Sequence, residues 1–251
     1  MVWKIADEVF PTITEEVYLT VNGISLRAPQ GQSLLLTLRQ HGFEIPTLCY
    51  HPDLPSEGQC RLCLVEMGEW PKTRLVNSCT YPTDADLMVQ THSERVLQAR
   101  RMVLELLLAR CPQAQIVKDL AQAHGVYESR FKTDDPDELC ILCGLCVRAC
   151  REIVGVSAIS MAHRTPGKLV TTPFLEQSEA CIGCGSCAFI CPTNVIPYTE
   201  KDGIRTVWGR DFELQPCTVC GNYIAPKAQL SHWAKLTGDP VESFYTCKDC
   251  R

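Results

Sequence analysis

Alternating apolar and polar residues predict a β-hairpin close to the start of the chain. Residues 17–21 and 24–28 both have strand-like patterns, and Asn22-Gly23 between them is typical of a two-residue hairpin turn. Three leucines then share one face of a helix expected over residues 34–40, with Ser33 in position to cap it. A hairpin followed by a crossing helix predicts a β-grasp domain.

Helical periodicity follows a short strand expected at residues 89–91. Apolar residues recur at helical spacing from Ser93, the expected N-cap, to about Arg110. A second helix should end at His124-Gly125. Residues 126–138 then form a linker that ends in a run of acidic residues, which we interpret as a solvated turn.

The remaining segments have weaker patterns. Residues 153–172 are consistent with short strands, and residues 229–236 with a short helix. Residues 1–15 have no clear period and form an extension, a candidate strap over a partner subunit. No apolar run reaches the roughly 20 residues that a membrane-spanning helix needs.

Composition narrows the choice of compartment and partner. The chain has 251 residues and 17 cysteines, but its first residues lack the basic and apolar regions of a signal peptide. The cysteines also fall in metal-ligand spacings rather than scattered pairs. We therefore expect a reducing location, either in the cytoplasm or in a complex that faces it. A formal charge of −5 gives no sign of the basic surface that nucleic-acid binding requires.

Two copies of one cysteine motif organise the chain between residues 140 and 192. Each reads Cys-x2-Cys-x2-Cys-x3-Cys, and the second ends in proline. This run binds cubane iron–sulfur clusters, with the fourth cysteine of each motif on the other cluster. Disulfides or zinc sites are the alternatives, but two complete copies favour clusters. The predicted ligands of one [4Fe–4S] cluster are Cys140, Cys143, Cys146 and Cys191, and those of the second are Cys181, Cys184, Cys187 and Cys150.

A different cysteine pattern follows the first predicted helix. Cys49, Cys60, Cys63 and Cys79 have the spacing Cys-x10-Cys-x2-Cys-x15-Cys, with Gly58 and Arg61 around the central pair. This segment resembles the [2Fe–2S] domain of the complex I large iron–sulfur subunit, of diaphorase small subunits of NAD-reducing hydrogenases, and of NAD-dependent formate dehydrogenases. The resemblance implies that the four cysteines bind a [2Fe–2S] cluster. Zinc is the alternative, although only one closely spaced pair is present.

The resemblance continues through residues 100–109 and then breaks. Many relatives next have a histidine and three cysteines that bind a further cubane, but here Cys111 stands at the histidine position and the three cysteines are absent. We expect that cluster to be missing and Cys111 to be a buried thiol. We assign no ligand role to His92 or to the other five histidines.

Two further cysteine pairs lie near the end of the sequence. Cys217-x2-Cys220 and Cys247-x2-Cys250 are separated by 26 residues. Two such knuckles resemble a zinc ribbon, in which four thiolates hold one ion and stabilise a segment too small for its own core. A further [4Fe–4S] cluster is the competing interpretation. We favour zinc, because cubane sites usually have three closely spaced ligands.

These observations predict an α+β chain of five segments. They are an N-terminal extension (1–15), a β-grasp [2Fe–2S] ferredoxin domain (16–92), a helical linker without the histidine-ligated cubane (93–138), a two-cluster [4Fe–4S] ferredoxin-like domain (139–200) and a zinc-ribbon-like tail (201–251).

Three clusters on two domains would form a short electron-transfer chain. The sequence has no dinucleotide-binding glycine motif, no P-loop and no cysteine pair left for a nickel–iron centre, so we expect no substrate site of its own. The resemblance to diaphorase small subunits implies an iron–sulfur subunit of a soluble NAD(P)-linked oxidoreductase. It would relay electrons between a flavin- and NAD(P)-binding subunit and a hydrogenase or formate dehydrogenase catalytic subunit, alongside a thioredoxin-like [2Fe–2S] subunit.

Other functions remain open at this point. An electron-bifurcating relative would pair NAD with ferredoxin as a partner. A free ferredoxin-like carrier would shuttle between enzymes without a stable partner. A metal-stabilised assembly or scaffold protein would contain the same sites but would not need them to be reduced.

Overall fold

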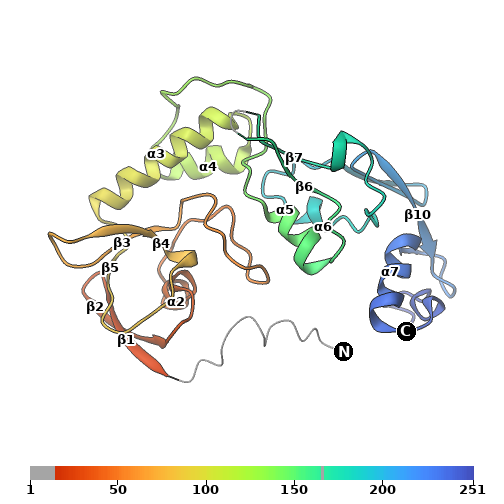
Figure 1. Cartoon of the computed structure of the whole chain (residues 1–251), viewed down its shortest axis with the longest axis horizontal. Coiled ribbons are helices and arrows are strands. Elements are labelled where there is room, and N and C mark those ends of the chain that lie inside the picture. Colours follow the sequence, from red (N-terminus) through yellow and green to blue (C-terminus); the bar gives the residue numbers. More distant parts are fainter. Residues whose placement is uncertain (1–14, 165–166) are drawn as a thin grey trace. The chain divides into compact units, whose positions relative to one another are not determined.

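The computed structural model describes residues 15–164 and 167–251, which form two compact units joined between Cys143 and Gly144 (Figure 1). Each unit combines helices with β-structure, so the chain has the predicted α+β class. Residues 1–14 of the predicted extension lie outside the described residues.

A five-stranded sheet forms the centre of the first unit, with the strand order β2-β1-β5-β3-β4. The predicted hairpin is present, and β1 also pairs in parallel with β5. The strands are β1 (Glu16–Val21), β2 (Ile24–Pro29), β3 (Leu64–Met67), β4 (Arg74–Asn77) and β5 (Met88–Gln90). The short helix η1 (Ser78–Thr80) follows β4.

Helix α2 (Leu34–Gln40) has the bounds expected from the sequence and packs its leucines into the core of this unit. Leu34, Leu35 and Leu38 contact the inward-facing residues of β1, including Leu19. Ser33 stands at the N-cap position, but its hydroxyl donates to the carbonyls of Ser78 and Cys79 instead of capping the helix. Ser33 therefore links the start of α2 to η1, the short helix that follows β4.

Two helices complete the first unit. Helix α3 (Glu94–Arg110) begins as predicted, because the Ser93 hydroxyl accepts a hydrogen bond from the Val96 backbone N–H at 3.3 Å. Helix α4 (Gln115–Ala123) packs on α3 and ends at His124. Residues 126–138, all of them described, contain no helix or strand, as expected for a linker.

The second unit begins with short elements around the cysteine motifs. They are α5 (Leu145–Arg148), the π-helical turn η2 (Ala149–Ile153), the paired strands β6 (Ser160–Ala162) and β7 (Leu169–Thr171), η3 (Pro173–Leu175) and α6 (Ser186–Phe189). The strands confirm the pattern expected between the two motifs.

A four-stranded sheet that the sequence analysis did not predict follows, with the order β11-β10-β9-β8. Its strands are β8 (Tyr198–Lys201), β9 (Ile204–Val207), β10 (Arg210–Pro216) and β11 (Tyr223–Pro226), and it is followed by α7 (Lys227–Thr237) and η4 (Val241–Phe244). Helix α7 contains the predicted helical segment and extends it in both directions.

Strands β9 and β10 share a core with the cysteine motifs. Val207 and Phe212 are buried in the same cluster as Cys146, Cys150 and Cys187. His232 on α7 adds a polar link, since its Nε2 lies 2.9 Å from the Val154 carbonyl oxygen just after η2. The segment after residue 200 is therefore packed against the ferredoxin motifs and does not form a detached tail.

Truncating one core leucine should show how much the β-grasp core depends on α2. Leu38 is fully buried, so Leu38→Ala should lower the free energy of unfolding by about 2–5 kcal/mol through lost burial and a cavity. Leu36 is exposed on the same helix and provides the matched control. Leu36→Ala should change stability by less than about 0.5 kcal/mol in the same urea titration followed by circular dichroism. Equal effects of the two substitutions would contradict this packing.

Candidate functional site: three groups of cysteines

The first group lies in the β-grasp domain, on the loop between α2 and β3 and on η1. Cys49, Cys60, Cys63 and Cys79 are all buried. The Cys60 backbone N–H donates to the Cys49 sulfur at 3.3 Å, and the Leu48 N–H donates to the Cys60 sulfur at 3.4 Å. The sulfurs of Cys63 and Cys79 lie 3.3 Å apart. The fold thus gathers this predicted ligand set as two close cysteine pairs.

Hydrogen bonding between the cysteines favours the thiolate form of one member of each pair. The bond from Cys49 lowers the pKa of Cys60 to about 6, and the bond with Cys79 lowers the pKa of Cys63 to about 7. The pKa of Cys49 and that of Cys79 move upward, because each shares its proton with its partner. Thiolate is the form that binds metal, so the loop already favours ligation at half of its cysteines.

Arg100 is a buried cation beside this group that the sequence analysis did not identify. Its side chain is 1% exposed and donates from Nη2 to the Leu64 carbonyl at 2.7 Å. Burial lowers the pKa of Arg100 to about 10, against the opposing effect of Cys63, so the guanidinium stays charged at neutral pH. A signal was present in the sequence, because Arg100 falls between Val96 and Leu104 on the buried stripe of α3.

The second group surrounds a small cavity in the second unit. Cys150 from η2, Cys187 from α6, and Cys181 and Cys184 from the loop before α6 all line it. The rest of the lining is largely apolar and includes Val156, Ala158, Ile159 and Val207. Cys150 comes from the first motif and the other three from the second. This is the crossed arrangement that the motif predicts.

Burial works against free thiolates in this cavity. It raises the pKa of Cys150, although the Ala158 backbone N–H, 3.2 Å from the Cys150 sulfur, opposes the shift. It raises the pKa of Cys187 to about 11. Buried thiolates are stable only when a positive charge compensates theirs, and iron supplies such a charge. The donor set and its apolar surroundings fit a cubane.

The hairpin of β9 and β10 holds the loop that carries Cys181 and Cys184. Arg210 donates from Nη1 to the carbonyls of Ser178 and Cys181 at 2.7 and 3.2 Å. Arg205 donates from Nη1 to the Gly183 carbonyl at 3.1 Å. Two arginines therefore satisfy carbonyl groups that a tightly curved ligand loop cannot pair within itself.

Phe212 also makes glycine necessary in this loop. Gly183 has φ +69°, and a Cβ there would lie 2.5 Å from the Phe212 ring. The sequence analysis did not single out this close approach, because the contact joins residues that are far apart along the chain.

The remaining predicted cubane ligands occupy both units. Cys140 and Cys143 lie at the end of the first unit, where Arg110 donates from Nε to the Cys140 carbonyl at 2.9 Å. Cys146 lies on α5 and Cys191 follows α6 in the second unit. This ligand set stays a prediction from the motif.

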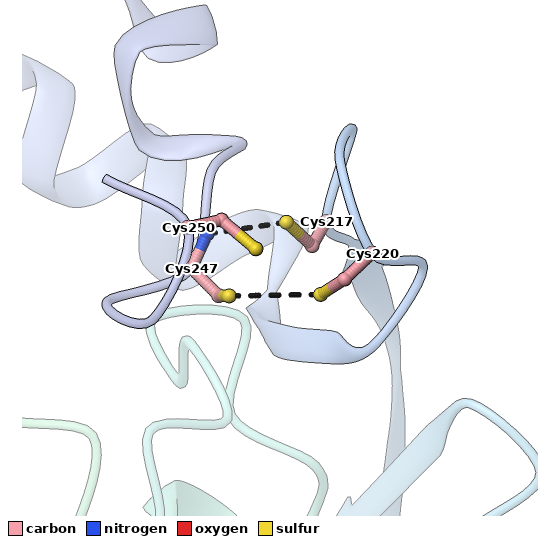
Figure 2. Close-up of side chains that lie close together, drawn as sticks. All are labelled: Cys217, Cys220, Cys247 and Cys250. Carbon is pink, nitrogen blue, oxygen red and sulfur yellow. Dashed lines mark hydrogen bonds between the residues drawn. The ribbon is translucent and has the colours of Figure 1, made fainter.

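The third group is formed by the two knuckles near the end of the sequence (Figure 2). All four sulfurs of Cys217, Cys220, Cys247 and Cys250 lie within 4.8 Å of one another. Those of Cys220 and Cys247 are 3.7 Å apart, and the Cys247 N–H donates to the Cys217 sulfur at 3.3 Å. Backbone hydrogen bonds, the one from Cys220 foremost, lower the pKa of Cys217 to about 6. Among residues 15–164 and 167–251, no other group of three or more potential ligands is gathered so closely.

Cys111 is fully buried after α3, and burial raises its pKa to about 12, in agreement with the expected apolar thiol. His41 and His124 lie 2.9 Å from backbone carbonyls of their own helices, while His92 is 2.6 Å from the Thr91 hydroxyl. None of these histidines belongs to a metal-ligand group within the described part of the chain. No helix of that part is long and apolar enough to cross a membrane.

Substituting Gly183 should test the packing of the hairpin on the ligand loop. Gly183→Ala places a methyl group against Phe212, so we expect a loss of roughly 1–3 kcal/mol in unfolding free energy and a lower iron content. Gly155 has a similar φ of +79° with open space around it, which makes Gly155→Ala the control for backbone strain alone. Similar losses in the two variants, measured by urea denaturation and iron analysis, would show that the ring contact is unimportant.

Comparisons with known proteins match two of the segments that carry these cysteines. Residues 14–94 match the model of the 2Fe-2S iron–sulfur cluster binding domain, and residues 177–196 match that of the 4Fe-4S binding domain. A subunit of an NADH-quinone oxidoreductase of Rhizobium meliloti is 30% identical over 215 residues, which cover 74% of this chain and 25% of the relative. Subunit HndD of the NADP-reducing hydrogenase of Solidesulfovibrio fructosivorans is 30% identical over 213 residues, covering 71% of this chain and 35% of the relative.

A solved structure gives the same result. A chain of the NAD+-reducing [NiFe]-hydrogenase in its H2-reduced state aligns with a TM-score of 0.62 and 29% identity, over 71% of this chain and 85% of the other. The chain spans only about a quarter to a third of the length of the curated relatives named above. The chain is thus similar to subunits of NADH-quinone oxidoreductases and of NAD(P)-reducing hydrogenases, and it contains segments that match a 2Fe-2S and a 4Fe-4S binding domain.

Proposed function

We propose that this chain is an electron-transfer subunit of an NAD(P)-linked oxidoreductase complex. The observation that carries the proposal is the presence of two kinds of ferredoxin domain on one chain whose relatives belong to such oxidoreductases. Plant-type [2Fe–2S] centres have potentials near −400 mV, close to the range of nicotinamide and hydrogen chemistry. The chain would receive electrons from one partner and pass them to another.

We infer that three clusters carry the electrons. The buried cysteine pairs of the β-grasp loop would bind the [2Fe–2S] cluster, and the cavity lined by Cys150, Cys181, Cys184 and Cys187 would bind one cubane. The motif assigns the other cubane to Cys140, Cys143, Cys146 and Cys191. Arg100 would act on the [2Fe–2S] site, because a buried positive charge favours the more negative, reduced cluster.

We further propose zinc at the four C-terminal cysteines. Thiolates at about 2.3 Å from one tetrahedral ion lie about 3.8 Å from each other. The 3.7 Å between Cys220 and Cys247 fits that geometry. In a cubane each cysteine binds a different iron, and its ligand sulfurs must stand farther apart. The close spacing therefore supports a single ion that stabilises the fold around β11 and α7.

The proposed partners are those that the relatives suggest. They are a flavin- and NAD(P)-binding subunit, a thioredoxin-like [2Fe–2S] subunit and a catalytic subunit of the hydrogenase or formate dehydrogenase type. Ferredoxin would join them if the complex bifurcates electrons. We propose a cytoplasmic location, because cluster thiolates require a reducing compartment.

Anaerobic purification of the tagged chain from its native cells tests this function. A flavoprotein should co-purify with the chain and transfer electrons to it. In this complex NADH or NADPH should therefore reduce the clusters, which is observed as electron paramagnetic resonance (EPR) signals. Dithionite should reduce the clusters of the isolated chain, whereas NAD(P)H alone should not reduce them. Clusters that dithionite fails to reduce would contradict the proposal, as would a chain that purifies without any partner.

Substituting Cys150 tests the crossed ligation of the second cubane. Cys150→Ser should impair the same cubane as Cys187→Ser, because both residues line one cavity. The cubane that survives in these two variants should therefore have the same EPR spectrum and midpoint potential. Cys143→Ser is the comparison variant. It should impair the other cubane, so that the cubane assigned to Cys150 and Cys187 survives. If the cubane that survives in Cys150→Ser had the same EPR spectrum and midpoint potential as the one that survives in Cys143→Ser, the assignment would be wrong.

Removing one knuckle cysteine separates zinc from iron. Cys220→Ser should lower the zinc content from about one per chain to near zero and leave the iron content unchanged. Cys111→Ala is the control and should retain both metals, because Cys111 belongs to none of the three groups. A loss of about four irons in Cys220→Ser would instead assign a further cubane to this site.

A further inference from the structure

The turn between β9 and β10 contains a residue that its backbone disfavours. Val207 pairs with Arg210, which leaves Trp208 and Gly209 as a two-residue hairpin loop. Both have positive φ, +53° and +69°, a conformation for which Asn-Gly is preferred. A bulky tryptophan at positive φ is an outlier. Strain of this kind persists where the side chain has a role that depends on its position.

The side chain of Trp208 reaches the cavity of the second group of cysteines. It lines that cavity together with Cys150, Cys181, Cys184 and Cys187. Its indole Nε1 is buried and has no hydrogen-bond partner of ordinary geometry in the part of the chain that the structure describes. Most of the polar side chains that line this cavity are cysteines, so a ligand sulfur is the acceptor that the site offers to the indole N–H.

The neighbouring contacts fix this donor in place. Arg205 and Arg210 stand on either side of the turn and bond to the backbone of the ligand loop. Gln177 donates from Nε2 to the Gly209 carbonyl at 2.6 Å. The apolar lining of the cavity strengthens any hydrogen bond made inside it. The hairpin thus holds the indole N–H at a cavity whose other polar side chains are those of four cysteines and Ser186.

We propose that the indole N–H of Trp208 donates a hydrogen bond to sulfur at the cubane held by Cys150, Cys181, Cys184 and Cys187, and so raises its midpoint potential. The inference rests on the proposed function, since it requires that cubane. A hydrogen bond to sulfur stabilises the more negative, reduced state of a cluster, and hydrogen bonds to sulfur are among the factors that set cluster potentials. The β9–β10 hairpin would then raise the midpoint potential of one cubane and leave that of the other unaffected.

A redox titration followed by EPR tests the proposal on the anaerobically purified, iron-loaded full chain. Trp208→Phe keeps the ring and removes the N–H. We expect the ratio of reduced to oxidised cubane at fixed potential to fall about tenfold, a negative shift of about 59 mV for a one-electron couple. Only one cubane should shift, while the other and the [2Fe–2S] cluster keep their potentials. Trp233→Phe is the matched control, because Trp233 lies on α7 and contacts Phe244, and it should shift no potential.

Unchanged potentials in Trp208→Phe, with all clusters loaded, would overturn this inference and leave the proposed function intact. The absence of cubane signals from the wild-type chain would instead contradict the proposed function. If Trp208→Phe loads poorly, wild-type protein labelled with ¹⁵N at the indole provides the second measurement. Pulsed EPR of the reduced cubane should then show a coupling to one indole nitrogen, and no such coupling would refute the hydrogen bond.

Discussion

The cost of burying cysteine sulfur governs the structure around the predicted cluster sites. A thiolate in an apolar cavity is unstable without compensating charge, and the raised pKa values of Cys150 and Cys187 express that cost. A cluster would remove the cost, and its ligand loop in turn needs neighbours that satisfy its backbone. Arg205 and Arg210 of the β9–β10 hairpin provide those contacts for the loop that carries Cys181.

The three groups of cysteines meet this constraint in different ways. In the β-grasp domain, hydrogen bonds between cysteines lower the pKa of Cys60 and Cys63, and Arg100 adds a buried positive charge. In the second unit, burial dominates and a hairpin covers the cavity. At the C-terminal knuckles, backbone N–H groups favour the thiolate form of Cys217, the buried member of that group. We propose that these environments suit different metal centres.

The sequence predicted local features well because their signals are local. The hairpin at Asn22-Gly23, the helix over residues 34–40 and the cysteine spacings each depend on residues close together in the chain. The sheet formed by β8 to β11 was missed, because β8 is almost entirely polar, although Asp202-Gly203 is a typical turn signal. The contacts of Trp208 and Phe212 with the cysteine motifs could not be predicted, since no spacing rule links residues this far apart.

The packing of the C-terminal segment changes how that segment is understood. The sequence suggested a zinc-stabilised tail beside a complete ferredoxin domain. In the structure, β9 and β10 contribute Val207 and Phe212 to the core around the cysteine motifs, and α7 lies within hydrogen-bonding distance of Val154. A metal at the knuckles would therefore stabilise the same strands and helix that pack against the second cubane site.

Metal and sulfide analysis of the anaerobically purified chain tests directly whether its cysteines hold three iron–sulfur clusters and one zinc ion. We expect about ten irons, about ten sulfides and about one zinc per chain, from one [2Fe–2S] cluster, two cubanes and one zinc ion. About fourteen irons without zinc would place a cubane at the knuckles. Zinc at the ferredoxin cysteines in place of iron would contradict the electron-transfer account itself.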